Sequence, residues 1–315
     1  MTATILDRLP GSPDDDPARV VCAQLDITGP YDLREVALMG FGHRDETSFD
    51  GAMRMAFCLD GDFERHVGVE ARQHSDRLEL ALRPAAGCPP LSPDEVTTAV
   101  RQVARVVSLD HDGAAFDRLC RADPRLAAVH AVAPGFRPAL FYSPYEAAVW
   151  ALLSARRSRS QAMGLRRRLT AACGVSLEVG GVPTDALPTP TALLRLESLP
   201  GLPADRLPRL HAVAVAAHGG LLSAERLRAL PVDEALAAVQ RLPGIGPFSA
   251  ALIVVRACGH ADAMTLGESH SRDAVQQAYG IDHPLTDEEL LGLAEGWRPY
   301  RTWVLVMLRA LGGRG

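Results

Sequence analysis

The sequence predicts an α+β protein in which a small domain with an antiparallel sheet precedes an all-helical domain. Apolar residues alternate with a period of two between residues 53 and 82, and they recur at helical spacing from residue 111 onward. The two parts also differ in charge. Residues 1–110 carry 11 arginines against 19 acidic residues, whereas residues 111–315 carry 22 arginines against 19. The second part is therefore the better candidate for binding an anionic partner.

The composition, with 47% hydrophobic and 23% charged residues over 315 positions, is that of an ordinary globular protein. All 33 basic residues are arginine, which excludes a lysine Schiff base and a lysine general base. No run of 18 apolar residues occurs, so we expect no membrane-spanning helix. The six cysteines lie more than 25 residues apart, which argues against zinc or iron–sulfur sites and favours free thiols in the cytoplasm.

The strands expected in the N-terminal part are predicted by the alternation of apolar and other residues. We expect a disordered acidic tail at residues 1–16 and a folded α+β domain at residues 17–110. Three alternating apolar runs separated by turn residues predict a three-stranded antiparallel meander. These runs are Met53 to Leu59, Phe63 to Ala71 and Leu78 to Leu82.

Capping boxes mark the starts of helices. Ser92 with Glu95 precedes a helix that carries four valines at helical spacing, and Ser143 with Glu146 precedes a strongly apolar one. That second apolar run stops at residues 154–160 and resumes as another helix. Further helices are expected at residues 32–38, 191–198, 206–217, 232–241, 248–258, 286–295 and 301–311.

The most informative stretch joins two of these helices through Leu242-Pro243-Gly244-Ile245-Gly246-Pro247. The two glycines allow a sharp turn with exposed backbone N–H groups, and Ile245 can pack inward between them. Together with the start of the next helix, including Pro247 and Ser249, these groups form a nest for phosphate. Such a contact binds a phosphate backbone and carries no sequence information. The plainer alternative is that the two glycines only form a turn that connects two helices and bind no ligand.

This hairpin, LPGIGPFSA, resembles that of the helix-hairpin-helix DNA glycosylases, and the chain is similar to their 3-methyladenine DNA glycosylase II branch. A helix pair at 145–174, a proline turn at 199–202, the hairpin and a closing segment at 296–301 fall in the family's order. The resemblance implies a glycosylase domain of two helical lobes at residues 111–315. It also implies that the meander belongs to a domain similar to half of the TATA-binding protein.

In the family, a catalytic aspartate stands twelve residues after the arginine that ends the second hairpin helix. Counted from Arg256, that position is Glu268, a glutamate where the family has aspartate. Asp262 matches an earlier, noncatalytic acidic position. The resemblance therefore implies Glu268 as the catalytic carboxylate, which would stabilise an oxocarbenium-like sugar. Two alternatives stay open: a protein that binds DNA without cutting it, and a glutamate that only caps the following helix.

Bifunctional relatives carry a Schiff-base lysine just after the hairpin, where this chain has Phe248. Because the chain has no lysine, the resemblance implies a monofunctional glycosylase that needs no cofactor. The family's hairpin carbonyls also hold a monovalent cation. The matching carbonyls here belong to Gln240, Leu242 and Ile245.

A glycosylase must flip its target base and fill the gap that it leaves. The family does so from the loop inside the first helix pair, where this chain has Ala155 and Arg156. Arg156, Arg157 and Arg159 interrupt an apolar helix there, so we expect them to contact DNA, with Arg156 as a candidate wedge. The plainer alternative is a solvated helix face.

The base pocket should be aromatic, because a cationic alkylated purine is attracted by π faces. Phe248, Leu252, Trp297 and Tyr300 occupy the matching positions, although a Trp/Tyr pair at this spacing is often part of a core. Trp150 is expected in the core. The resemblance thus implies a monomeric monofunctional DNA glycosylase that excises alkylated bases from damaged double-stranded DNA in base excision repair. The alternative is a noncatalytic protein that binds distorted DNA.

Overall fold

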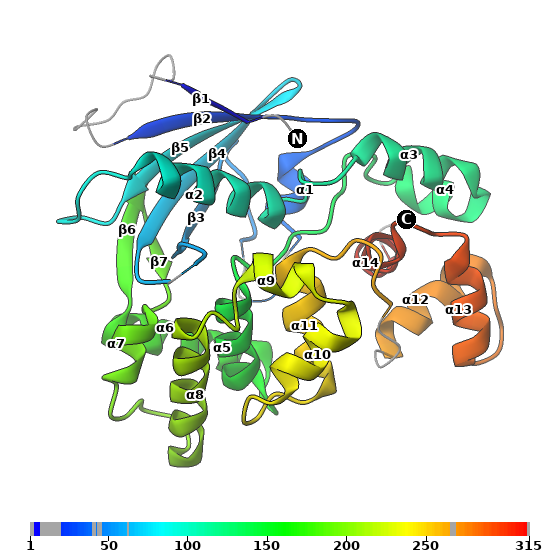
Figure 1. Ribbon diagram of the computed structural model, residues 1–315. Helices are drawn as coiled ribbons and strands as arrows, with labels where there is room; N and C mark the ends of the chain where they lie inside the picture. Colours follow the sequence, from blue (N-terminus) through cyan, green and yellow to red (C-terminus); the bar gives the residue numbers. More distant parts are fainter. Residues whose placement is uncertain are drawn as a thin grey trace.

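The structure is a computed structural model that describes residues 3–6, 20–39, 42, 46–61, 63–264 and 269–313. A five-stranded antiparallel sheet lies at one end of the molecule, and helices fill the rest (Figure 1). Within the described residues, no helix is both long enough and apolar enough to cross a membrane. The predicted α+β fold class is confirmed.

The sheet has the strand order β1-β2-β5-β4-β3, and each neighbouring pair is antiparallel. The predicted meander is confirmed as β3 to β5, in which Val69 lies opposite Met55 on one side and Leu82 on the other. The prediction of a disordered tail is wrong for Ala3–Leu6, which pair with the neighbouring strand as an edge strand. The strands are β1 (Ala3–Leu6), β2 (Val21–Asp26), β3 (Met53–Cys58), β4 (His66–His74) and β5 (Arg77–Pro84).

One face of this sheet is covered by α1 (Leu33–Ala37) and α2 (Pro93–Val106), which share a buried core with it. The predicted capping box of α2 is confirmed. Ser92 Oγ accepts a hydrogen bond from the Glu95 N–H at 3.3 Å, and a Glu95 carboxylate oxygen accepts one from the Ser92 N–H at 2.7 Å. These two bonds satisfy N–H groups that the first helical turn leaves without partners.

The other face of the sheet is packed by a β-hairpin that the sequence did not predict, β6 (Val175–Val179) and β7 (Val182–Ala186). Leu177 and Val179 form a small apolar core with Ala56 of β3. Gly68 of β4 faces this hairpin so closely that a Cβ there would lie 2.8 Å from Val179 Cγ2. The region after residue 110 is therefore not all-helical, and its hairpin completes the core of the N-terminal domain.

The helices after residue 110 form two lobes around separate cores. The first lobe holds α5 (Pro144–Ser154), α6 (Arg159–Cys173), α7 (Pro190–Leu194), α8 (Leu207–His218), α9 (Ala224–Ala229), α10 (Val232–Gln240) and α11 (Pro247–Cys258). The second holds α3 (Gly113–Ala122), α4 (Pro124–His130), α12 (Ser269–Tyr279), α13 (Asp287–Glu295) and α14 (Arg301–Leu311). Two of the last helices, α12 and α14, thus return to pack against α4 (Figure 1).

Candidate functional site

The loop between α10 and α11 forms the hairpin that the sequence predicts. Gly244 has a φ of +87°, a left-handed conformation that favours glycine. A Cβ at Gly244 would lie 2.9 Å from Leu152 Cδ2, whereas a Cβ at Gly246 would meet nothing within 4 Å. Gly244 is therefore required for the fold of the turn, and Gly246 keeps an open approach to its backbone.

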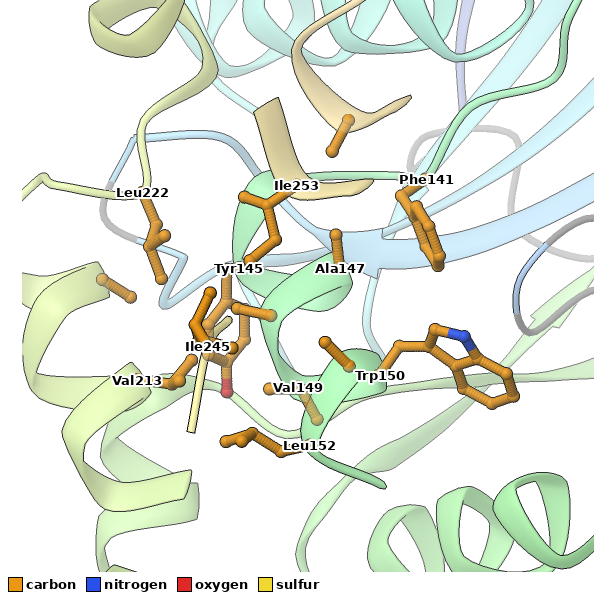
Figure 2. Packing of buried hydrophobic residues seen from close by; sticks show 14 of the residues in the cluster. Phe141, Tyr145, Ala147, Val149, Trp150, Leu152, Val213, Leu222, Ile245 and Ile253 are labelled. Carbon is orange, nitrogen blue, oxygen red and sulfur yellow. The ribbon is translucent and has the colours of Figure 1, made fainter. Parts of the chain in front are cut away.

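Ile245 anchors this turn. Its side chain is only 5% exposed and belongs to the same buried cluster as Tyr145 and Val213 (Figure 2). Gly246 is the N-cap of α11 and Pro247 is its first residue, and no side chain caps this helix start. The exposed N-terminus of α11 therefore presents backbone N–H groups, including that of Ser249, and a partial positive charge toward solvent. This arrangement can bind an anion without a charged side chain.

The three carbonyls predicted to hold a cation belong to this same turn. The Leu242 carbonyl already accepts a hydrogen bond from the Ile245 N–H at 3.1 Å, which leaves its second lone pair available. Neutral carbonyl oxygens are donors that suit an alkali cation. Among the described residues, no group of three or more His, Cys, Asp or Glu side chains is arranged to hold a metal ion. A cation at Gln240, Leu242 and Ile245 stays a prediction.

A cavity of about 890 Å³ lies between the two lobes, and we call it the interlobe cavity. On one side it is lined by Phe248, Ala251, Leu252 and Val255, which form one face of α11. On the other it is lined by Thr302, Leu305, Val306 and Arg309, which form one face of α14. Trp150 and Ser154 of α5 and Arg159 of α6 also line it. A site bounded by two lobes can enclose a ligand of nucleobase size.

Two of the four predicted base-pocket residues line this cavity. Phe248 does so with 63% of its surface exposed, and Leu252 lies one turn further along α11. The prediction is wrong for Trp297 and Tyr300, which are buried in the core of the second lobe. Trp297 donates through Nε1 to the Tyr279 hydroxyl at 2.9 Å, and the Tyr300 hydroxyl donates to the Asp112 carbonyl at 2.7 Å.

Sequence reasoning missed an aromatic residue at the cavity, because Trp150 was expected in the core. Trp150 is buried but lies at the edge of its cluster, where its indole points away from Tyr145 (Figure 2). Every residue of α5 from Pro144 to Leu153 is buried, so its pattern could not distinguish a cavity-facing side. In α14, by contrast, Arg309 shares a face with Leu305 and Val306. A charged residue on this otherwise apolar face could have indicated from the sequence that the face borders a cavity.

The arginine-rich loop between α5 and α6 borders a second depression of about 590 Å³. Arg156 adopts a left-handed φ of +57°, and with Arg157, Arg168 and Arg206 it lines this depression. Arg206 donates to the Leu152 and Ala155 carbonyls at the end of α5. Burial lowers the pKa of Arg206, and the neighbouring cations Arg157 and Arg156 act in the same direction. An anion bound here would offset this repulsion.

No protein-family model matches the chain. The chain is 28% identical over 298 residues to a protein of Mycobacterium tuberculosis described as a probable bifunctional transcriptional activator/DNA repair enzyme AlkA, in each of two strains. The match covers 91% of this chain and 56% of those proteins. The chain is their homologue, and it spans about half the length of these curated relatives.

Solved structures decide the fold. A 3-methyladenine DNA glycosylase from Archaeoglobus fulgidus superimposes with a TM-score of 0.71 and 20% identity, over 91% of this chain and 96% of that one. MBOgg1 in complex with a low-affinity DNA ligand superimposes with a TM-score of 0.72 and 16% identity, over 100% and 99%. The chain has the helix-hairpin-helix DNA glycosylase fold. The 8-oxoguanine glycosylase/lyase of Clostridium acetobutylicum, in its apo form, also shares this fold, with a TM-score of 0.64 and 15% identity over 93% and 96%.

The predicted catalytic residue of this glycosylase fold, Glu268, lies outside the described residues. On either side of it, Met264 and Ser271 both line the interlobe cavity. Asp262, the other acidic residue of the loop, accepts hydrogen bonds from Arg301 Nε at 2.9 Å and from Arg298 Nη1 at 3.0 Å. It is held at the start of α14, and no described aspartate or glutamate lines the cavity.

Proposed function

We propose that this protein is a monofunctional DNA glycosylase that excises alkylated bases, of the 3-methyladenine type, from double-stranded DNA during base excision repair. The observation that carries the proposal is the juxtaposition of the open hairpin with the interlobe cavity. The helix that begins at Gly246 also supplies Phe248 and Leu252 to the cavity wall. One helix therefore joins a site for backbone phosphate to a chamber of base size. The names of the homologue and of the archaeal enzyme support the alkylated-base substrate.

Glu268 is the proposed catalytic carboxylate. Ser271 at the cavity wall is three positions further along the chain, so chain length alone keeps the two Cα atoms within roughly 11 Å of each other. When the bond between the base and deoxyribose breaks, positive charge grows on the sugar, and a carboxylate stabilises it while water attacks. Asp262 is an unsuitable substitute, because two arginines already engage its oxygens.

The composition supports the proposal that the base is released without strand cleavage. A glycosylase that also cleaves the strand through a Schiff base needs an amine, and the chain contains no lysine. The position after the hairpin proline holds Phe248, which is free to stack on a base. We therefore propose that the protein only hydrolyses the glycosidic bond. We also propose that it acts on DNA as a monomer in the cytoplasm. The six cysteines are all free thiols, as a reducing compartment maintains them.

DNA is proposed to be held at two places. The hairpin nest at Gly244, Ile245 and Gly246 takes a phosphate through backbone N–H groups, and the loop carrying Arg156, Arg157 and Arg159 contacts the strand beside the cavity. Arg159 lines the cavity and Arg156 lines the adjoining depression, so this loop borders both hollows. Arg156 is the proposed wedge in the emptied stack.

The direct test is release of free base from methylated duplex DNA by the wild-type protein and by Glu268→Gln. The substitution removes the charge and keeps the size of the side chain. We expect the wild type to release base and the variant to lose at least about 100-fold in rate, with unchanged DNA affinity. If neither protein releases base although both bind the duplex, the glycosylase proposal fails.

A second candidate function is binding of distorted or abasic DNA without base release. It is favoured by glutamate at position 268, because the extra methylene moves the carboxylate by about 1.5 Å and a misplacement of about 1 Å can cost 100-fold in rate. Glu268→Asp distinguishes the two functions. A large gain of activity means that the natural site is impaired for catalysis, whereas a loss means that the site is built for glutamate.

A further inference from the structure

Leu152, near the end of α5, lies where the hairpin and α8 meet. Its side chain lies against Gly244, since a Cβ there would be 2.9 Å from Leu152 Cδ2. Its carbonyl accepts a hydrogen bond at 2.8 Å from Nη1 of Arg206, the residue just before α8. Arg206 also lines the depression of about 590 Å³. The start of α8 is therefore held between the hairpin and this depression.

Arg209, in the first turn of α8, lies beside the hairpin. A Cβ at Gly244 would be 3.0 Å from Arg209 Cδ and 3.4 Å from Arg209 Nη1, so the guanidinium is next to the turn. The Arg209 side chain is 40% exposed. Gly246, the N-cap of α11, is two positions beyond Gly244, so about 7 Å at most separates their Cα atoms. A phosphate bound at the start of α11 is therefore within reach of the Arg209 side chain.

An exposed carboxylate is the intramolecular partner of Arg209. Arg209 Nη2 donates to Asp205 Oδ2 at 3.0 Å, and Asp205 lies four residues earlier in the chain. Because the Asp205 side chain is 64% exposed, water screens this ion pair and its contribution to stability is small. A guanidinium that meets a phosphate can form two parallel charged hydrogen bonds with it. Exchange of Asp205 for a phosphate is therefore favourable for Arg209.

The charges around Arg206 show that these residues act on one another. Burial lowers the pKa of Arg206, while the Asp205 carboxylate raises it. Three nearby cations also lower this pKa, namely Arg157, Arg209 and Arg156. Asp205 thus balances part of the positive charge that the arginines gather between the depression and the hairpin. Its removal leaves more of that charge for an anionic partner.

We propose that Arg209 binds a DNA phosphate next to the hairpin, and that Asp205 competes with this phosphate for the Arg209 guanidinium. The inference rests on the DNA binding of the proposed function, and it adds a contact between the two places already proposed. The strand is then held continuously from the loop at Arg156, past the start of α8, to the nest at Gly246. Asp205 lowers the affinity for duplex DNA, because its ion pair with Arg209 breaks when DNA binds.

The test measures the affinity for an undamaged duplex over a range of salt concentrations. We expect Arg209→Gln to reduce the slope of log affinity against log salt by about 1, because one phosphate fewer is neutralised. Arg209→Lys keeps the charge and should keep the slope. Asp205→Asn should raise the affinity about threefold at low salt, the effect expected when one exposed ion pair no longer has to break.

The double variant of Asp205→Asn with Arg209→Gln distinguishes competition from a general effect of charge. If Asp205 acts by occupying Arg209, Asp205→Asn raises the affinity of the wild type and has no effect in the Arg209→Gln protein. If Asp205 only repels phosphate, the gain is as large in both proteins, and the inference is overturned. A wild type that gains nothing from Asp205→Asn, or a slope that Arg209→Gln leaves unchanged, overturns it as well.

The matched control is an ion pair of the N-terminal domain, between Arg54 and Asp50. These residues are also four positions apart, Arg54 Nη2 lies 2.9 Å from Asp50 Oδ2, and the Asp50 side chain is 62% exposed. Asp50→Asn and Arg54→Gln should leave both the affinity and the slope unchanged. A gain from Asp50→Asn as large as that from Asp205→Asn means that any lost carboxylate has this effect, and the inference fails.

The failures of the two proposals differ. If the wild type binds the duplex and Asp205→Asn gives the same gain with and without Arg209, only the inference fails, and base release is still expected. If the variants behave as described but the wild type releases no base from methylated duplex, the glycosylase proposal fails and the Arg209 contact stands. If the wild type does not bind the duplex at low salt, both proposals fail.

Discussion

The two glycines of the hairpin differ in what surrounds them, although the sequence presents them as a pair. Gly244 has a positive φ and is pressed against Leu152, whereas Gly246 has a φ of −87° and open space beside it. A methyl group at the first position strains the backbone and collides with the core. At the second position it only narrows the approach to the N–H groups of α11.

We therefore expect Gly244→Ala to lower the free energy of unfolding by roughly 2 kcal/mol, as the sum of backbone strain and overpacking. Gly246→Ala should change stability by less than about 1 kcal/mol and weaken DNA binding instead. Urea denaturation and duplex binding of both variants check this. Equal destabilisation by the two substitutions would show that the turn is not built as described.

Residues in and beside the interlobe cavity also separate into two classes. Trp297 is 1% exposed and fills the second lobe, while Phe248 is 63% exposed at the cavity. We expect Trp297→Ala to cost about 3–5 kcal/mol of stability. Phe248→Ala should leave the unfolding midpoint nearly unchanged and reduce base release. A Phe248→Ala variant that unfolds as early as Trp297→Ala would be evidence against the cavity assignment.

At the level of elements, α6 begins where the arginine loop ends. Ser158 Oγ accepts from the Gln161 N–H at 3.3 Å, and the Gln161 side-chain oxygen accepts from the Ser158 N–H at 3.0 Å. This capping box fixes the first turn of α6, which carries Arg159 to the cavity wall. The cap therefore links helix stability to the placement of a proposed functional side chain.

Ser158→Ala should lower the free energy of unfolding by about 1 kcal/mol and also weaken DNA binding. The matched control is Thr286→Ala, which removes an equivalent capping box from α13. We expect the control to lose similar stability with no change in DNA affinity. Denaturation and DNA-binding titrations at one salt concentration distinguish the two variants. Equal DNA affinities of Ser158→Ala and Thr286→Ala would show that α6 is not part of the DNA-binding surface.

Much of this arrangement of elements could be predicted from sequence, for reasons that are local. The meander, the capping box at Ser92 and the turn between α10 and α11 each follow from neighbouring residues, and the structure confirms them. At Ser143 the structure shows one half of the predicted box, the hydrogen bond from the Glu146 N–H to Ser143 Oγ. The β6–β7 hairpin was missed because its stability depends on a distant surface, at Ala56 and Gly68. The edge strand Ala3–Leu6 was missed for the same reason, since only pairing with β2 orders it.

The cavity residues were harder to predict than the folded elements. Trp297 and Tyr300 were placed in the pocket by the resemblance to the family, but Trp297 packs against Tyr279 of α12 and Tyr300 packs against Phe116 of α3, so both belong to the core. Trp150 was hidden because α5 is apolar on every side. Which face of a buried helix borders a hollow depends on two lobes approaching each other, and no single window of sequence contains that information.

For the whole molecule, charge is distributed unevenly between the acidic N-terminal part and the arginine-bearing helical part. DNA affinity should therefore fall steeply with salt, because each phosphate contact releases counterions. We expect the double variant Arg156→Gln and Arg168→Gln to reduce the slope of log affinity against log salt by about 2. Arg101→Gln, which removes an exposed arginine of α2, should leave the slope unchanged. An unchanged slope in the double variant would show that the depression lined by Arg156 and Arg168 does not contact DNA.

Stability should also depend on pH through histidines in different parts of the molecule. Burial lowers the pKa of His66, His130 and His260 below the ordinary value of 6.5. The unfolded chain then binds more protons below pH 6.5, so stability is lost as the pH falls from about 7 toward the folded pKa values. Urea midpoints at pH 7.5 and 5.5 measure the loss, which should be smaller in His130→Gln. Equal losses in both proteins would contradict this assignment.

The central claim is that the interlobe cavity receives the base that the protein releases. Ala251 lies on the cavity face of α11, between Phe248 and Val255 and away from the hairpin glycines. The most direct measurement is single-turnover base release by Ala251→Phe, which fills the cavity without altering the hairpin. We predict that this variant binds undamaged duplex like the wild type and loses at least about tenfold in base release. Release at the wild-type rate would show that the base is bound elsewhere.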